Sequence, residues 1–335
     1  MKLKTSVKNY EELFAYINEN LKKMRKRGEE SFRDYMARKL DYVYRVVVNE
    51  LKHLERILRT IEESGEFYRE LFKAYIGVEP ENIMLKTRVY TRIAHRIYRE
   101  TQLKFREIGE KEGRKASVVF KENAGRILSL YKGLARTSPL INQYLRELAK
   151  MPDVKGDYVV VIAGLPQVGK STLLSMLTRA KPEIGTYPFT TKTLIAGHMD
   201  VDGYGKIVLL DSPGILDTPL EDKNLVELKT VLAIKHLADH VLYIFAVYPY
   251  FYYTLDEQLR VYESITKILG DKPKTIVLNK VDLMEPRSVD AVVKRIEEHT
   301  GVPPIPISAL TGFNLELLKK SVLEAFMAKI QRRKQ

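Results

Sequence analysis

The chain has 335 residues, of which 45% are hydrophobic and 30% charged, and it contains no cysteine. This length predicts two or three domains, and the composition excludes a disordered chain, a disulfide framework and cysteine-based zinc or catalytic sites. No apolar run approaches the roughly 18 residues of a membrane helix, and no apolar signal segment follows Met1. We therefore expect a soluble, cytoplasmic protein with no membrane partner.

Positive charge is concentrated in the first half of the chain. Residues 1–150 carry 33 Lys and Arg against 21 Asp and Glu, whereas residues 151–335 carry 23 against 22. Nearly all of the net charge of +13 thus lies in the first half, which predicts a polyanionic partner, nucleic acid before membrane. A well-solvated helical surface would carry the same excess without a partner.

The first half is predicted to be helical throughout. Apolar residues recur there with helical spacing, Gly65 and Gly77 end two of the segments, and Pro80 begins another. The predicted helices cover residues 7–27, 31–63, 67–76, 80–112, 115–136 and 141–150. Long helices joined by short breaks predict an antiparallel, all-α helical bundle, and we place this basic domain at residues 1–152.

After residue 152 the pattern changes to alternating strands and helices. The predicted strands cover residues 158–163, 193–201, 207–210, 241–247, 275–278 and 305–307. Such alternation predicts a doubly wound, mainly parallel α/β sheet, in a second domain at residues 153–335. The glycine-containing connection at residues 202–205 is typical of a hairpin, so it predicts one antiparallel edge strand.

A phosphate-binding loop is predicted between the first strand and the helix after it. Residues 164–171 read GLPQVGKS, which fits G-x-x-x-x-G-K-[ST] in the required strand–loop–helix context. Such a loop surrounds phosphate oxygens with backbone N–H groups, while Lys170 reaches the β- and γ-phosphates and Ser171 binds Mg²⁺. The candidate nucleotide-binding residues here are Gly164, Pro166, Gln167, Val168, Gly169, Lys170, Ser171 and Thr172.

A base-recognition segment follows the strand at 275–278. It reads Asn279-Lys280-Val281-Asp282, and the Asp282 carboxylate can accept hydrogen bonds from N1–H and N2–H₂ of guanine, a pair that adenine lacks. The stem of Lys280 can pack on the base, and Asn279 can tie this segment to the phosphate loop. Downstream, the backbone N–H groups of Ser308, Ala309 and Leu310 suit guanine O6. The predicted ligand is therefore GTP or GDP.

Two further segments are predicted to sense the γ-phosphate. Asp211-Ser212-Pro213-Gly214 fits D-x-x-G, so Asp211 can hold Mg²⁺ through water and the N–H of Gly214 can meet a γ-phosphate oxygen. Upstream, Thr190 and Thr191 offer hydroxyls for Mg²⁺. Loops ordered by γ-phosphate and Mg²⁺ and released on hydrolysis form a GTPase switch. Because Ile215 stands where Ras-like enzymes have a water-orienting Gln, we expect slow intrinsic hydrolysis.

The switch segments resemble those of the nucleolar GTP-binding protein family, an Obg-like branch of GTPases. The resemblance covers residues 190–200 and 211–224, and a weaker match, FYREL at residues 67–71, extends it to the helical half. It implies a GTPase that acts in maturation of the large ribosomal subunit, with its helical domain on precursor ribosomal RNA and with ribosomal or assembly proteins as further partners. It also implies that Thr191 joins Ser171 and Asp211 as a Mg²⁺ ligand, and that Lys170, Thr191 and Gly214 are catalytic.

Two features of the sequence depart from the family, one residue and one segment. Gln167 stands where potassium-activated relatives have an Asn that helps to hold the ion, so the resemblance does not carry K⁺ dependence over. The aromatic run at residues 248–253 replaces a usual polar loop. We expect this run either to pack against the helical domain or to form a contact surface.

The sequence thus predicts a switch protein that hydrolyses GTP slowly with Mg²⁺ and acts in large-subunit assembly through ribosomal RNA. The candidate RNA contacts are four arginines on one face of a predicted helix, where they can pair with phosphates: Arg88, Arg92, Arg96 and Arg99. Two alternatives stay open, in which the helical domain docks a protein or an anionic membrane surface instead.

Overall fold

The computed structural model describes residues 6–178, 181–211, 213, 216–217, 231 and 234–334. It divides into two compact units, one that extends to Arg146 and one that begins at Glu147. None of the helices in these described ranges is both long and apolar enough to cross a membrane. Each unit has a hydrophobic core of its own.

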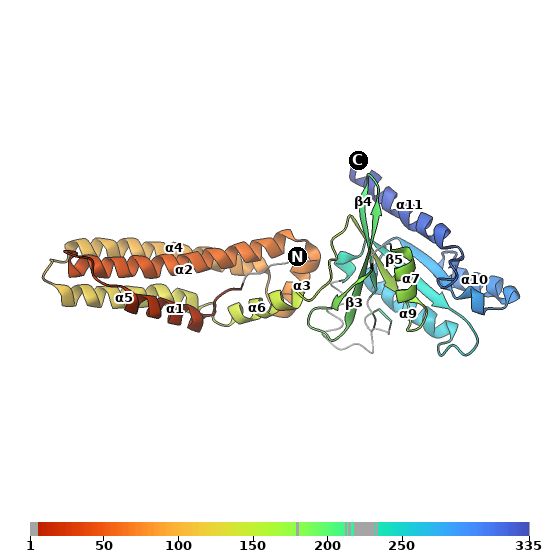
Figure 1. Cartoon of the computed structure of the whole chain (residues 1–335), viewed down its shortest axis with the longest axis horizontal. Coiled ribbons are helices and arrows are strands. Elements are labelled where there is room, and N and C mark those ends of the chain that lie inside the picture. The colour runs from red at the N-terminus through yellow and green to blue at the C-terminus, as the bar shows by residue number, and fades with distance from the viewer. Residues whose placement is uncertain are drawn as a thin grey trace. The chain divides into compact units, whose positions relative to one another are not determined.

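The first unit is built from α-helices (Figure 1). These are α1 (Tyr10–Lys23), α2 (Phe32–Glu63), α3 (Glu66–Ile76), α4 (Pro80–Glu107), α5 (Gly113–Lys132) and α6 (Thr137–Leu148), the last of which leads into the second unit. Helices α2 and α4 run antiparallel, because Tyr98 of α4 donates to Asp41 near the start of α2, whereas Arg88 lies beside Glu55 near its end. The predicted helical bundle is confirmed.

Helix α2 supplies the central apolar stripe of this unit. Its buried side chains recur every three or four residues, and burying each contributes about 1.5–3 kcal/mol. Seven of them are fully buried: Leu40, Val43, Val47, Leu51, Leu54, Leu58 and Ile61. The hydroxyl of Ser31 caps the helix by accepting from the N–H of Asp34, so α2 begins where the sequence predicts.

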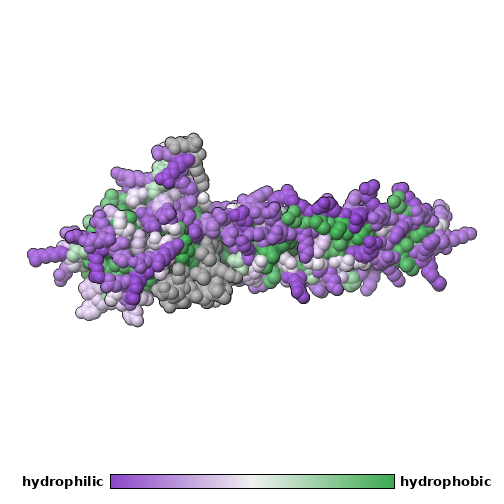
Figure 2. Space-filling model, turned by 180° about the vertical axis from the view of Figure 1, so that it is seen from behind, coloured by the Kyte–Doolittle hydropathy of each residue, from purple (hydrophilic) through white to green (hydrophobic). Residues whose placement is uncertain are grey.

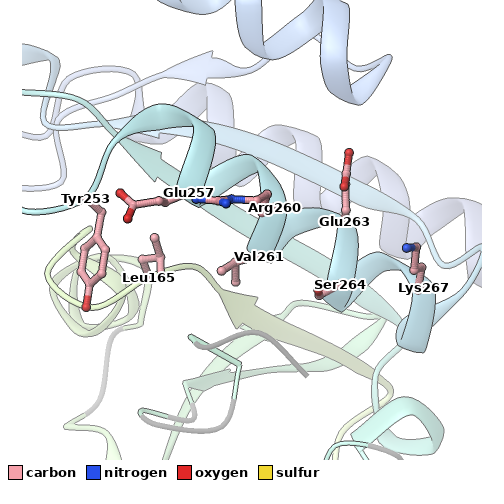
Figure 3. A pocket seen from close by; sticks show the side chains of 8 residues that line it. All are labelled: Leu165, Tyr253, Glu257, Arg260, Val261, Glu263, Ser264 and Lys267. Atoms are coloured by element: carbon pink, nitrogen blue, oxygen red, sulfur yellow. The ribbon is translucent and has the colours of Figure 1, made fainter. Parts of the chain in front are cut away.

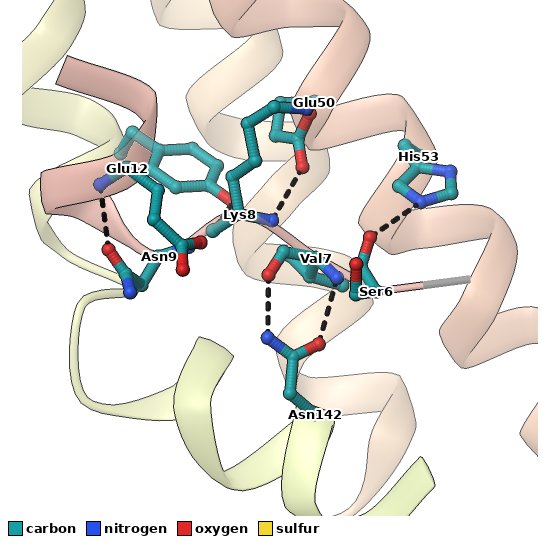
Figure 4. A network of polar contacts seen from close by, with 9 residues as sticks. Ser6, Val7, Lys8, Asn9, Glu12, Glu50, His53 and Asn142 are labelled. Carbon is teal, nitrogen blue, oxygen red and sulfur yellow. Dashed lines mark hydrogen bonds and ion pairs between the residues drawn. The ribbon is translucent and has the colours of Figure 1, made fainter. Parts of the chain in front are cut away.

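The segment before α1 is extended rather than helical, contrary to the helix predicted from residue 7. The backbone N–H of Val7 donates to Asn142 Oδ1 over 2.8 Å, and Asn142 Nδ2 donates to the Val7 carbonyl over 2.6 Å (Figure 4). The backbone and side chain of Lys8 both donate to Glu50, over 2.8 and 3.3 Å. Residues 7 and 8 are therefore held to α6 and α2 by side chains that replace helical hydrogen bonds.

Helix α1 begins at Tyr10 because a reciprocal capping box defines its N-terminus there. The side chain of Asn9 accepts from the N–H of Glu12, and the side chain of Glu12 accepts from the N–H of Asn9. These two bonds satisfy N–H groups that the first helical turn leaves unpaired.

The second unit contains a sheet of seven strands in the order β2-β3-β4-β1-β5-β6-β7 within the described residues. The strands are β1 (Tyr158–Ala163), β2 (Glu183–Thr186), β3 (Thr193–Val201), β4 (Gly205–Asp211), β5 (His240–Ala246), β6 (Lys274–Asn279) and β7 (Ile305–Pro306). Strands β4, β1, β5, β6 and β7 are parallel, whereas β3 pairs antiparallel with β4 and β2. The predicted mainly parallel α/β fold is confirmed.

Strand β2 was not predicted, so the antiparallel edge has two strands instead of one. This strand has four residues, it includes Gly185, and the side chain of Ile184 is 71% exposed. It therefore lacks the alternating burial by which a sequence reveals a strand.

In the described ranges, further helices follow β1, β5, β6 and β7. They are α7 (Lys170–Leu177), α9 (Leu255–Leu269), α10 (Pro286–Thr300) and α11 (Leu315–Lys334), with the short 3₁₀ helix η2 (Val281–Leu283) after β6. The register pairs Ile162 of β1 with Asp211 of β4, and Ala246 of β5 with Asn279 of β6. The loops that follow these strands therefore meet at one edge, where open α/β sheets bind their ligands.

Candidate nucleotide-binding site

The loop between β1 and α7 has the backbone conformation that its glycines permit. Gly164 and Gly169 have φ angles of +142° and +100°. A Cβ atom on Gly164 would lie 2.5 Å from the carbonyl oxygen of Ile244, and one on Gly169 would overlap the side-chain amide of Asn279. Both motif glycines are thus required by conformation and by the close approach of neighbouring groups.

Lys170 is held inside this loop. Its side chain is nearly buried, and its ammonium donates to the carbonyls of Gly164 and Leu165, over 2.9 Å in each case. Burial lowers the pKa of Lys170, while the carboxylates of Asp211 and Asp217 oppose that shift. The loop therefore encloses a cation at the point where the sequence places the β- and γ-phosphates.

Two of the three predicted magnesium ligands lie together. Ser171 Oγ donates to Asp211 Oδ2 over 2.6 Å, which joins the first turn of α7 to the end of β4. A hydroxyl and a carboxylate are oxygen ligands of the kind Mg²⁺ prefers, so this pair fits the ion. The third, Thr191, is exposed and lies outside the cavity lining given below. Gly214 lies outside the described residues.

The buried amide of Asn279 connects three segments of the site. Its Nδ2 donates to the Val168 carbonyl over 2.8 Å, and its Oδ1 accepts from the N–H of Ala309 over 2.9 Å. The side chain is 1% exposed. The phosphate loop, the segment after β6 and the segment after β7 are therefore held together by one residue.

The predicted base-binding residues lie in the segments after β6 and β7. Asp282 is exposed in η2. The N–H groups of Ser308 and Ala309 donate within the protein, to the Phe313 carbonyl over 3.2 Å and to Asn279. Among the bonds of the described residues, the N–H of Leu310 has no acceptor. Leu310 is therefore the residue of this trio that is best placed to offer a donor to guanine O6.

A cavity of about 500 Å³ lies beside the phosphate loop. It brings together seven predicted residues and three that sequence reasoning did not select. Its lining consists of Pro166, Gln167, Gly169, Lys170, Ser171, Thr172 and Lys280, with Pro213, Asp217 and Tyr248 as the additional residues. The aromatic run at residues 248–253 was the feature of the sequence that could have drawn attention to Tyr248. The sequence did not predict that its ring lies next to Lys280.

A second cavity, of about 490 Å³, runs along α9 (Figure 3). Leu165 and Tyr253 close one end of it, and Glu257, Arg260, Glu263 and Lys267 of α9 contribute two negative and two positive charges. Because these charges balance, this cavity suits a phosphate chain less well than the one that contains Lys170 and Lys280.

Comparison with known proteins identifies relatives of both units. Residues 159–280 match a family model described as a 50S ribosome-binding GTPase. An uncharacterized protein of Methanocaldococcus jannaschii is 31% identical over 245 residues, which cover 73% of this chain and 68% of that protein. Nucleolar GTP-binding protein 1 of Drosophila melanogaster is 30% identical over 209 residues, which cover 61% of this chain and 32% of that protein.

A solved structure of a nucleolar GTP-binding protein 1 from Plasmodium falciparum aligns with 52% of this chain and 89% of its own, with 28% identity and a TM-score of 0.44. The matches span 32% and 44% of the length of the Drosophila melanogaster and Caenorhabditis elegans nucleolar relatives. The resemblance seen in the switch segments is confirmed: the chain belongs to the nucleolar GTP-binding protein 1 family of P-loop GTPases.

Proposed function

We propose that this protein binds GTP and GDP in the 500 Å³ cavity beside the phosphate loop and hydrolyses GTP to GDP and phosphate. The observation that carries the proposal is the bridge made by Asn279, which holds the phosphate loop and both base segments together. One ligand that carries phosphates at one end and a base at the other would contact all three segments.

Each residue has a distinct part in this proposal. Lys170 and the backbone of the phosphate loop bind the β- and γ-phosphates, Ser171 and Asp211 hold Mg²⁺, and Asp282 recognises guanine. Mg²⁺, when bound, neutralises charge that develops on the phosphates. Since Thr191 is exposed, its part in metal binding requires the segment before β3 to rearrange around the nucleotide, as in other GTPase switches.

Base recognition gives the direct test. Asp282→Asn replaces a double acceptor by a mixed amide, so GDP affinity should fall about tenfold or more while xanthosine diphosphate affinity rises. The matched control is Asp290→Asn, which changes another exposed carboxylate, in α10, and should bind GDP as the parent does. Unchanged GDP affinity in Asp282→Asn would show that Asp282 does not recognise the base.

Turnover gives a second test. Without a water-orienting Gln after the D-x-x-G segment, the free protein should hydrolyse GTP at about 10⁻⁴–10⁻² s⁻¹, as unstimulated GTPases do. Ribosomal particles should raise this rate. A free-protein rate above about 1 s⁻¹ would reveal a complete catalytic apparatus and contradict a partner-dependent switch.

We further propose that the helical unit binds ribosomal RNA during assembly of the large subunit. The match to a family model described as a 50S ribosome-binding GTPase supports a ribosomal partner. On α4, Arg92, Arg96 and Arg99 are exposed, and none of them has an ion-pair partner among the described residues. Arg88 differs, since its Nε lies 2.8 Å from Glu55 Oε1. Three free guanidinium groups on one helix face suit a phosphate backbone.

A protein partner on the same helix is a second candidate. Leu85, Val89 and Leu103 of α4 are 50%, 41% and 57% exposed, and Figure 2 shows hydrophobic residues interspersed with hydrophilic ones on the helical unit. Co-sedimentation with ribosomal particles, with and without nuclease, separates the candidates. Binding that survives complete digestion of the RNA would favour a protein partner.

A further inference from the structure

We propose that Tyr248 is a positioning residue of the nucleotide site, which holds Lys280 in place before the nucleotide binds. This inference rests on the proposed function, because Lys280 acts only through the guanine nucleotide that it packs against. Both residues line the 500 Å³ cavity together with the phosphate loop.

The contact between the two side chains has two components. Lys280 Nζ donates to the Tyr248 hydroxyl over 3.1 Å, and it lies 4.3 Å from the centroid of the tyrosine ring. The first is a hydrogen bond from a charged donor, and the second is a cation–π interaction. Both residues are half-buried, so solvent weakens these interactions less than it would at a fully exposed site.

The sheet brings these residues together. Ala246 of β5 is in register with Asn279 of β6, so Tyr248 and Lys280 leave adjacent strands at the same edge. Lys280 also has a φ of +64°, a conformation that few residues other than glycine adopt. The backbone at this position therefore directs the side chain, and Tyr248 holds the end of it.

Tyr248 is itself fixed by its own loop. Its carbonyl accepts from the N–H of Phe251 over 3.1 Å, which closes a turn with Pro249 and Tyr250 at the central positions. The Tyr248 and Phe251 rings stack with their centroids 4.8 Å apart, and the Phe251 ring packs edge-on against Tyr253. Because this turn and the stacking fix the Tyr248 ring, the ring can restrict the flexible side chain of Lys280.

The expected benefit is preorganisation. A free lysine side chain samples many rotamers, and ordering it on binding costs conformational entropy. When Tyr248 has already restricted the ammonium, the aliphatic stem of Lys280 lines the cavity before the nucleotide enters. Loss of Tyr248 should therefore act mainly on the lifetime of the complex, because interface changes act chiefly on dissociation.

A double-mutant cycle tests the proposal. Dissociation of a fluorescent GDP analogue is measured for the full-length parent, Tyr248→Ala, Lys280→Ala and the double variant. We expect Tyr248→Ala to speed dissociation about tenfold in the parent background and to have almost no effect when Lys280 is already replaced. Tyr248→Phe keeps the ring and loses the hydroxyl, so it should give an intermediate rate and show that folding is preserved.

The control is Tyr252→Ala, which removes an 83% exposed ring from the same loop. It should dissociate GDP at the parent rate. Equal effects of Tyr248→Ala in both backgrounds, or an equal effect of Tyr252→Ala, would overturn the proposal by showing that the ring acts on the loop and not through Lys280. Failure of the parent to bind GDP at all would overturn the proposed function, and this inference with it.

Discussion

The hydroxyl of Ser171 and the carboxylate of Asp211 are 2.6 Å apart, although they come from different elements 40 positions apart in the chain. Asp211 is fully buried, so its position is set by the sheet, while Ser171 is set by the first turn of α7. The fold alone brings these two groups together, so their proposed role in metal binding can be tested by substitution.

Ser171→Ala should abolish most of the Mg²⁺-dependent gain in nucleotide affinity. Removal of the hydroxyl deletes one oxygen ligand but leaves the phosphate loop intact, so binding in the presence of EDTA should stay near the parent value. Titrations of GDP with Mg²⁺ and with EDTA measure the difference. Ser175→Ala is the matched control, because its hydroxyl is one turn further along α7 and donates to the Ser171 carbonyl. A parent-like response to Mg²⁺ in Ser171→Ala would remove this residue from the metal site.

The stability of the GTPase unit should fall as the pH drops below neutrality. His240 is hydrogen-bonded to Tyr158 and Thr275, over 3.0 Å on each side, and burial lowers the pKa of His240 from 6.5 to about 4. Between these values the unfolded chain binds a proton that the folded chain excludes, so stability is lost as pH falls through 6.5 and levels off below 4.

This histidine should account for a loss of about 2 kcal/mol between pH 7 and pH 5. Urea unfolding of the parent and of His240→Gln at both pH values measures it. The variant should be less stable at pH 7, since its side chain cannot reproduce both hydrogen bonds, but its stability should change less with pH. If both proteins show the same change with pH, another group carries the dependence.

Replacing Arg92, Arg96 and Arg99 together by Gln should weaken RNA binding and reduce its salt dependence. If each arginine neutralises one phosphate, the slope of log affinity against log salt should flatten by roughly 2–3. Filter binding of the full chain to structured ribosomal RNA at several salt concentrations measures this slope. Arg88→Gln should have a smaller effect, because Arg88 already pairs with Glu55.

Arg45 and Arg59 of α2 provide the control for this experiment. They are exposed, but each pairs with an acidic residue one turn earlier in the helix, Asp41 and Glu55. The double Gln variant should keep the parent slope. If the triple α4 variant kept the parent slope, this helix face would be a solvated surface that does not bind RNA.

Asn142→Leu should destabilise the helical unit by about 2–3 kcal/mol, because it leaves buried backbone groups of Val7 without partners. Urea unfolding followed by circular dichroism measures the loss, and hydrogen exchange at the Val7 amide should become faster. Asn82→Leu, at an exposed position in the first turn of α4, should change stability by no more than about 0.5 kcal/mol. Equal effects of the two substitutions would contradict an anchoring role for Asn142.

Helix boundaries were predictable within a few residues where capping and apolar spacing agree, as at Ser31 of α2. The extended segment at residues 7 and 8 was not predictable, because its partners Glu50 and Asn142 lie 42 and 135 positions away along the chain. Tyr248 could not be predicted for the same reason, whereas the motif residues could. Spacing along the chain reveals a phosphate loop, whereas the neighbour of Lys280 depends on which strand lies beside β6. Likewise, no motif shows that the N–H of Ala309 already has an acceptor in Asn279.

The amide of Asn279 has a thermodynamic consequence for fragments of the nucleotide. Since one side chain joins the phosphate loop to the segment after β7, a ligand that orders either segment also orders the other. Guanosine and pyrophosphate, offered as separate molecules, should therefore bind with positive cooperativity, each raising the affinity of the other by the same factor. The intact nucleotide should gain this linkage within a single molecule, so the protein should bind it more tightly than an equimolar mixture of its parts.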